Sequence, residues 1–231
     1  MIKEKSILKQ DVYENTRNRF DDFREILKDS VDQIQAKVGD KDERLSFYYK
    51  EKGAYEAEIK LAGDILIFYM HTNVFQFDKS HSLWKSGYLK EDPNNGFVGV
   101  INIYNFLADS FKFGRKNDRG YLIARIFINR DNHFLVQGKR QLGFLYNDFI
   151  NSDLSKDRIR DVVNSSILYT LDFDLFAPPY QSQQEVSVQE IQALSQNLNI
   201  VTGKRLGFRF SADDDSPAED DSPTDDDSPE L

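Results

Sequence analysis

The feature that most constrains the fold is a change in the spacing of apolar residues near position 45. Between residues 10 and 38, apolar side chains recur every three or four positions, which places them in one stripe along an amphipathic helix. The stripe consists of Phe20, Phe23, Leu27, Val31, Ile34 and Val38. A helix packed on a sheet is the preferred interpretation. A coiled-coil seam is the alternative, which a stripe of less than three heptads disfavours.

Between residues 45 and 137 the apolar residues alternate with polar ones, a pattern typical of half-buried strands. In Ala54–Leu61, for example, Tyr, Ala, Ile and Leu alternate with Glu and Lys. Gly63 and Asp64 separate this run from Ile65–Met70 and predict a two-residue hairpin turn. Short links of this kind favour an antiparallel sheet. Further strands are expected at Leu45–Lys50, Thr72–Phe77, Phe97–Ile103, Tyr121–Asn129 and His133–Gln137.

After residue 142 the spacing becomes helical again. Ser155 can cap a helix that continues to about Leu171. Ser187–Glu190 is a capping box that opens a second helix, and Leu206–Phe210 is a candidate closing strand. The predicted fold class is α+β: an N-terminal amphipathic helix, an antiparallel sheet and two C-terminal helices in one domain.

The last nineteen residues are three copies of an acidic hexapeptide followed by Leu231. They contain ten acidic residues and no basic one, so a net charge of −9 for the chain becomes +1 for residues 1–212. Such a composition cannot bury a core. The sequence therefore predicts a globular domain over residues 1–210 and a disordered acidic tail over residues 211–231. In composition the tail resembles the acidic tails of bacterial single-stranded-DNA-binding proteins, although it ends Ser228–Leu231 instead of in their apolar tip.

Several classes of protein are disfavoured by composition. The absence of cysteine excludes disulfides, a thiolate nucleophile and Cys-ligated metal sites. The first ten residues are charged where a signal peptide has an apolar core, and the longest apolar run, Ile65–Met70, is far too short to span a membrane. No phosphate-binding loop or nucleophile elbow is present, and three scattered histidines do not indicate a metal site. We therefore expect a cytoplasmic protein with no membrane contact, metal or cofactor, which acts by binding and not as an enzyme.

Positive charge is concentrated in two segments of the nearly neutral body. Residues 110–145 hold eight Lys or Arg and two acids, and residues 200–212 hold three and none. Aromatic residues are interleaved with these bases, as in proteins that bind single-stranded nucleic acid, where cations contact phosphates and rings stack on bases. Burial of the rings on the opposite strand face is the alternative. The residues expected to bind a polyanion are Lys112, Arg115, Lys116, Arg119, Lys139, Arg140, Lys204, Arg205 and Arg209.

Three functions remain open at this level. The first is a non-enzymatic binding or regulatory protein whose basic surface binds single-stranded nucleic acid or another polyanion. The tethered acidic tail would then compete with the polyanion for that surface, or would contact a basic protein. The second is a protein–protein interaction or small-ligand-binding module with a solubilising tail. The third is a metal-dependent nuclease or hydrolase. Glu58 and Lys60 match the acid-x-Lys part of a nuclease signature, in which the carboxylate holds Mg²⁺ and the lysine stabilises charge, but the preceding Pro-Asp is absent.

Overall fold

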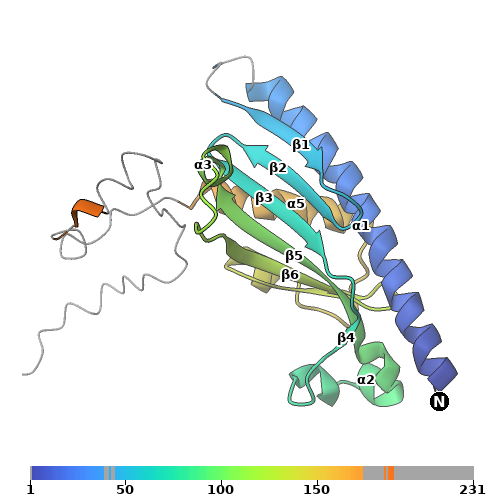
Figure 1. Ribbon diagram of the computed structural model, residues 1–231. Helices are drawn as coiled ribbons and strands as arrows, with labels where there is room; N and C mark the ends of the chain where they lie inside the picture. The colour runs from blue at the N-terminus through green and yellow to red at the C-terminus, as the bar shows by residue number, and fades with distance from the viewer. Residues whose placement is uncertain (1, 39–41, 43–44, 174–184, 186, 190–231) are drawn as a thin grey trace, which may run out of the picture.

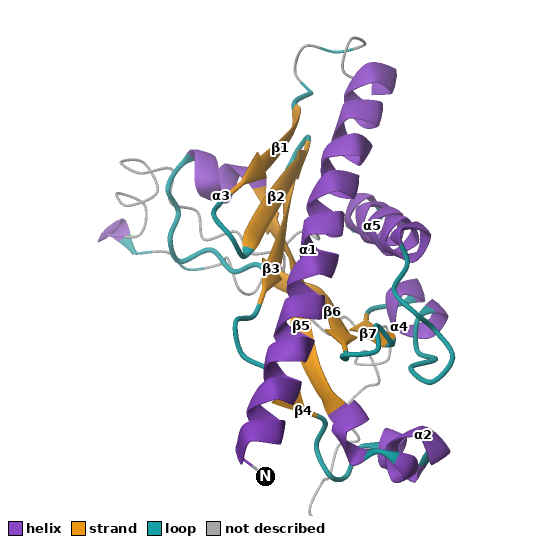
Figure 2. Ribbon diagram, turned by 90° about the vertical axis from the view of Figure 1, so that its right-hand side faces the viewer, coloured by secondary structure: helices purple, strands orange, loops and turns teal. Residues whose placement is uncertain are grey.

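Helix α1 (Ile2–Val38) lies along one face of an antiparallel sheet, and helix α5 (Lys156–Leu171) contacts it on the same face (Figure 1). The computed structural model describes residues 2–38, 42, 45–173, 185 and 187–189. Figure 2 shows α1 and α5 next to each other on one side of the strands. These residues form a single α+β domain, which confirms the predicted fold class.

The sheet contains seven strands in the described part of the chain, and each paired strand is antiparallel to its neighbour. The order across the sheet is β1-β2-β3-β5-β6-β7. Strand β4 lies outside this order and pairs with the first residues of β5. The strands are β1 (Phe47–Glu51), β2 (Glu56–Leu61), β3 (Asp64–Met70), β4 (Phe75–Gln76), β5 (Phe97–Leu107), β6 (Tyr121–Ile128) and β7 (Phe134–Gly138).

Helix α1 buries four of the six residues of the predicted stripe, while Ile34 and Val38 are partly buried. Its buried apolar residues are Leu8, Val12, Phe20, Phe23, Ile26, Leu27 and Val31. The helix begins well before the predicted start near residue 10, because Leu8 and Val12 pack against Phe97 at the end of the sheet. This contact stabilises a first turn whose own side chains are mostly charged.

The β2–β3 hairpin turns one residue earlier than predicted. Leu61 pairs with Asp64, so the two turn residues are Ala62 and Gly63. Ala62 adopts a positive φ of 54° to make this turn. The observed register places Leu61 on the core side of the sheet, whereas a slip of one residue would reverse the faces of the strand.

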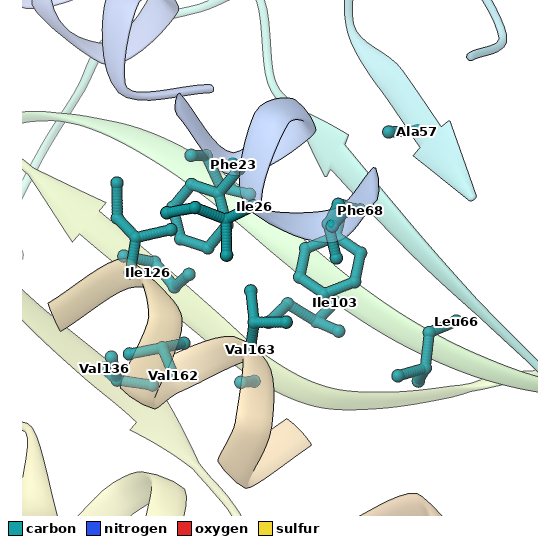
Figure 3. Close-up of a cluster of buried hydrophobic side chains, with 14 of the residues drawn as sticks. Phe23, Ile26, Ala57, Leu66, Phe68, Ile103, Ile126, Val136, Val162 and Val163 are labelled. Atoms are coloured by element: carbon teal, nitrogen blue, oxygen red, sulfur yellow. The ribbon is translucent and has the colours of Figure 1, made fainter. Parts of the chain in front are cut away.

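The core lies between the two helices and the sheet (Figure 3). The rings of Phe23 in α1 and Phe68 in β3 have centroids 6.0 Å apart. Val162 and Val163 of α5 are fully buried and belong to the same cluster as Ile126 of β6. The helices therefore cover one face of the sheet and leave its other face to the loops and shorter elements.

Helix α1 approaches β5 closely at Gly99. A Cβ atom at this position would lie 2.0 Å from Oγ1 and 2.7 Å from Cβ of Thr16. Thr16 is fully buried, and its hydroxyl donates to the carbonyl of Val12 over 2.7 Å. The absence of a side chain at Gly99 allows the helix to rest on the strand backbone.

The segment before β5 differs from its prediction. Only Phe75–Gln76 of the expected strand Thr72–Phe77 pairs with β5, and the expected loop Asp78–Gly96 contains helix α2 (Gly87–Glu91) between two 3₁₀ turns. The reason is a second apolar cluster on the sheet face opposite α1, which draws this segment onto the sheet. Its buried members are Phe77, Leu89, Val98, Leu135 and Phe149.

A buried asparagine joins this segment to the β6–β7 hairpin. Asn129 is fully buried, and its Oδ1 accepts from the backbone N–H groups of Asp131 (3.0 Å) and His133 (2.9 Å). Its Nδ2 donates to the hydroxyl of Tyr88 (2.9 Å) and to the carbonyl of Asn95 (3.4 Å). The predicted hairpin is thus confirmed, and it is joined to α2 by Asn129 and by the bond from the hydroxyl of Tyr88 to Asp131 (2.9 Å).

Two short helices follow sheet strands in the second half of the chain. Strand β5 continues through Leu107 before α3 (Ala108–Lys112) begins, and α4 (Gln141–Leu145) follows β7. The predicted cap of α5 is confirmed, because Ser155 Oγ accepts from the backbone N–H of Arg158 over 3.4 Å.

Some predictions fall outside the described residues. These are most of the helix that opens at Ser187, the strand Leu206–Phe210 and the tail 211–231, so the boundary at residue 210 stays a prediction. Within the described ranges, no helix is both long and apolar enough to cross a membrane.

Candidate binding groove

The sheet face opposite α1 and α5 carries a polar row across three strands. Alternation along β5 places Ile101 and Ile103 in the core, so Asn102 between them faces away from the helices. Asn102 pairs with Arg125 of β6, and Arg125 pairs with Gln137 of β7. Directly opposed residues on one sheet face have Cβ atoms about 4.5–5.5 Å apart. The three side chains therefore form a continuous row.

An apolar row lies beside the polar one. Val100 pairs with Phe127, and Phe127 pairs with Leu135, on the same three strands and the same face. The two rows form the floor of a groove of about 690 Å³. Ligand pockets commonly measure about 300–1,000 Å³. The groove therefore has the size and the mixed chemistry of a binding site.

Strand β4 and the loops on either side of it line one side of the groove. His71, Phe75 and His81 contribute to this wall, and Gly143 and Asn147 line the groove beyond β7. In Figure 1, β4 and the segment that leads to α2 lie at one end of the sheet. The second apolar cluster holds this segment in place, because Phe77 and Phe127 have ring centroids 5.4 Å apart.

Arg125 is fixed in the centre of the floor. Its Nε donates to Gln137 Oε1 over 3.1 Å, a second N–H of the guanidinium donates to the same oxygen, and the guanidinium lies 5.4 Å from the centre of the Phe127 ring. Because Gln137 accepts through its oxygen, its NH₂ group remains a donor. Asn102 is 8 % exposed, and its side chain makes no hydrogen bond with another described residue. Arg125 and Gln137 thus present donors that their mutual hydrogen bonds position in advance.

Two histidines add donors at the wall. Nδ1 of His71 accepts from the backbone N–H of Asn73 over 3.0 Å, and Nδ1 of His81 accepts from that of Leu83 over 3.3 Å. A neutral imidazole whose Nδ1 accepts carries its proton on Nε2. Each ring also packs on a phenylalanine ring. Both histidines can therefore offer an Nε2–H group to a ligand.

One carboxylate also lines the groove. Ser80 donates to Asp78 through its hydroxyl (2.6 Å) and its backbone N–H (2.8 Å), and these bonds lower the pKa of Asp78. Asp78 therefore stays ionised at neutral pH and offsets the charge of Arg125. The described lining is close to electrically neutral but is rich in hydrogen-bond donors.

The predicted cations that the structure describes lie at one end of the sheet, beyond the residues that line the groove. In an antiparallel sheet, the end of β5, the start of β6 and the end of β7 lie together. Lys112–Arg119 connects β5 to β6, and Lys139 and Arg140 follow β7 directly after Gly138, which lines the groove. The backbone N–H of Lys139 donates to the carbonyl of Ile123 over 3.1 Å. The structure therefore brings two of the predicted groups to the same end.

The predicted cations differ in their surroundings. The five exposed ones are Lys112, Lys116, Arg119, Lys139 and Arg140. Arg115 is mostly buried and forms an ion pair with Asp118 at 3.0 Å, so its position has a structural explanation. Lys204, Arg205 and Arg209 lie outside the described residues.

The interleaved aromatic rings divide between the two faces of the sheet. Phe134 is buried in the main core, and Tyr121 packs on that side against Phe173. Phe127 lies in the groove, while Phe111 and Phe144 are exposed near the basic end. The sequence alone does not indicate a role for Asn102, Arg125 or Gln137. Their alternation was visible, but the register that aligns them was not.

The candidate catalytic pair is engaged in contacts with neighbouring strands. Glu58 is 3 % exposed, forms an ion pair with Lys52 and accepts from the hydroxyl of Tyr48 over 2.9 Å. Burial and this hydrogen bond raise the pKa of Tyr48 to about 12. Nζ of Lys60 donates to Ser46 Oγ over 2.7 Å. In the part of the chain that the structure describes, no three His, Asp or Glu side chains are grouped to hold a metal ion.

No protein-family model matches this chain, and neither a curated protein nor a solved structure matches it.

Proposed function

We propose that this protein is a non-enzymatic binding protein, which takes single-stranded nucleic acid or another polyanion on the open face of its sheet. The observation that carries the proposal is the continuity between the groove and the basic end. Arg125 and Phe127 lie on the groove floor, and the groove reaches Gly138, immediately before Lys139 and Arg140. A single-stranded nucleic acid with one base in the groove can therefore place its phosphates next to exposed cations.

The acidic tail is proposed to compete for the same cations. It carries ten acidic residues and is covalently attached, so its effective concentration at the surface is high. Nineteen extended residues reach roughly 60 Å at about 3.3 Å per residue, which is enough to cross a domain of this size. Removal of the negative charge should therefore expose a binding surface that the whole chain partly covers. A cytoplasmic location, suggested by the absence of cysteine, belongs to the same proposal.

The test is binding of a fluorescent single-stranded oligonucleotide, followed by anisotropy. Three proteins are compared: the whole chain, a chain that ends at Phe210, and the whole chain with its ten tail acids changed to Asn or Gln. Both altered proteins should bind more tightly than the whole chain. If the five exposed cations each contact a phosphate, log K should fall with log salt at a slope of about −3.5. Negligible binding by all three proteins would refute the proposal.

A small-ligand-binding protein is the second candidate, and the local shape of the groove favours it. A hollow of about 690 Å³ has the size of a pocket for a small molecule. This function differs from the first in its expected signature. Binding of a neutral small ligand should depend weakly on salt and should not change when the tail charge is removed, because the described groove lining is nearly neutral.

A further inference from the structure

We infer that the groove is a base-recognition subsite, in which one unstacked nucleobase lies on the apolar row and has its edge read by the polar row. The inference rests on the proposed function and deepens it, because it assigns separate roles to the groove and to the basic end. The groove would select the base, and the exposed cations would hold the phosphates.

The floor has the arrangement that a planar, hydrogen-bonding ligand requires. Phe127 provides a partly buried ring, over which the Arg125 guanidinium lies at 5.4 Å from the centroid, and the mostly buried Val100 and Leu135 extend the apolar row on either side of it. The polar row runs parallel to the apolar row and is displaced from it by two residues along each strand. Because successive residues on one strand face are about 6.5–7 Å apart, a base on the apolar row can direct its edge at the polar row. Stacking on an aromatic ring commonly changes affinity by about 5- to 150-fold per base.

The hydrogen-bonding groups favour bases that have a carbonyl oxygen at position 4 of a pyrimidine or position 6 of a purine. A guanidinium has five N–H donors, and only two from Arg125 are used by Gln137. The amide of Gln137 and the Nε2–H groups of His71 and His81 add further donors. Uracil presents a carbonyl oxygen at position 4 and guanine one at position 6, whereas cytosine and adenine carry at these positions an exocyclic amine, which requires an acceptor. The groove should therefore prefer uracil or guanine to cytosine or adenine.

The charge of the lining separates this subsite from a phosphate site. Asp78 is ionised and lines the same groove as Arg125, so the guanidinium is not an isolated positive charge there. The exposed Lys139, in contrast, follows the groove without an acidic residue adjacent to it in the sequence, and the guanidinium of the next residue, Arg140, lies 5.7 Å from the ring centre of Tyr169 in α5. A phosphate is accordingly expected at the basic end, and the neutral, polar edge of a base is expected in the groove.

Uracil and cytosine provide a matched pair of ligands. They have the same size and ring system and differ along one edge, where uracil has a carbonyl at position 4 and an N3–H donor, and cytosine has an amine at position 4 and an N3 acceptor. Oligouridine and oligocytidine of equal length are titrated into the whole chain, with the salt dependence of each recorded. We expect oligouridine to bind about fivefold or more tightly, since one well-formed base contact commonly discriminates by about that factor or more.

Variants of the groove and of the basic end should affect different quantities. Arg125→Lys keeps the charge but loses the planar fork, so it should abolish the preference for uridine and leave the salt slope unchanged. Lys139→Gln with Arg140→Gln should make the slope shallower by about 1.4 and keep the preference. Arg158→Gln is the control: this arginine lies on α5, is 54 % exposed and should change neither quantity. Thermal melting verifies that each variant is folded.

The outcomes distinguish the two proposals. If neither oligonucleotide binds to the whole chain or to the chain with a neutralised tail, the proposed function fails and the subsite fails with it. If both oligonucleotides bind with a salt-dependent affinity but equally tightly, or if Arg125→Lys keeps the full preference for uridine, the subsite is refuted and polyanion binding stands. A preference that is lost in Arg125→Lys and kept in Arg158→Gln supports the subsite.

Discussion

The contact between α1 and β5 gives a sharp prediction for Gly99→Ala. In the present structure, the added Cβ would lie 2.0 Å from Oγ1 of Thr16 and 2.7 Å from both Cβ and Cγ2. Rotation of the threonine side chain can move Oγ1 and Cγ2, but Cβ is attached to the helix backbone. The substitution therefore forces α1 to move away from the sheet by several tenths of an ångström, together with its buried Phe20 and Phe23.

The expected loss of stability follows from two opposing effects. A glycine-to-alanine change at an unstrained position stabilises a protein by about 0.4–1 kcal/mol, because it restricts the unfolded chain. Overpacking of a core costs typically about 1–3 kcal/mol, and occasionally more when backbone must move. Since the clash at Gly99 involves backbone-attached atoms, we expect a net loss of about 2 kcal/mol. For a chain of this length that is a decrease in Tm of roughly 4–8 °C.

The assay is urea unfolding of the variants, followed by circular dichroism. Gly87→Ala is the matched control, because a Cβ at that position meets no atom within 4 Å, and its stability should be unchanged or slightly increased. Thr16→Ala combined with Gly99→Ala removes two of the three clashing atoms. The double variant should therefore be more stable than the sum of the single effects by about 1 kcal/mol or more. Additive effects, or a Gly99→Ala protein as stable as the Gly87→Ala control, would show that α1 does not rest on β5 at this point.

Three further predictions concern stability and pH. Asn129→Ala should lower the free energy of unfolding by about 2–4 kcal/mol, because it removes all four hydrogen bonds of a fully buried side chain, whereas the exposed Asn151→Ala should have little effect. Burial raises the pKa of Tyr48 and Tyr88 to about 12 in the folded state, above their unfolded value near 10. Their contribution to stability should thus be complete below about pH 10 and decrease as the pH rises toward 12. Alkaline unfolding that is identical in Tyr48→Phe, Tyr88→Phe and the unaltered protein would contradict this pH dependence. Ser155→Ala should cost about 0.5–2 kcal/mol through loss of the α5 cap, measured by thermal unfolding, and Ser155→Gly should cost only a few tenths of a kcal/mol.

Local pattern was sufficient for the main elements of the fold. The spacing of Phe20, Phe23 and Leu27 predicted which face of α1 is buried, and alternation in Ala54–Leu61 predicted which face of β2 meets it. The errors arose where distant contacts decide the structure. The expected loop Asp78–Gly96 forms helical turns because its apolar residues pack on strands about fifty positions later in the chain. No local spacing reports such a partner.

The groove shows the same limit in the candidate site. Asn102, Arg125 and Gln137 are single polar residues on three separate strands, and none of them belongs to a recognisable motif. They become a row only through the register of β5, β6 and β7, including an irregularity between Ile103 and Tyr104 that shifts the pairing beyond it. A one-residue slip of β6 would turn Arg125 toward the helices and remove the row. The segments richest in positive charge could therefore be found from the sequence, whereas the arginine that we propose reads the base could be distinguished from its neighbours only by the pairing of the strands.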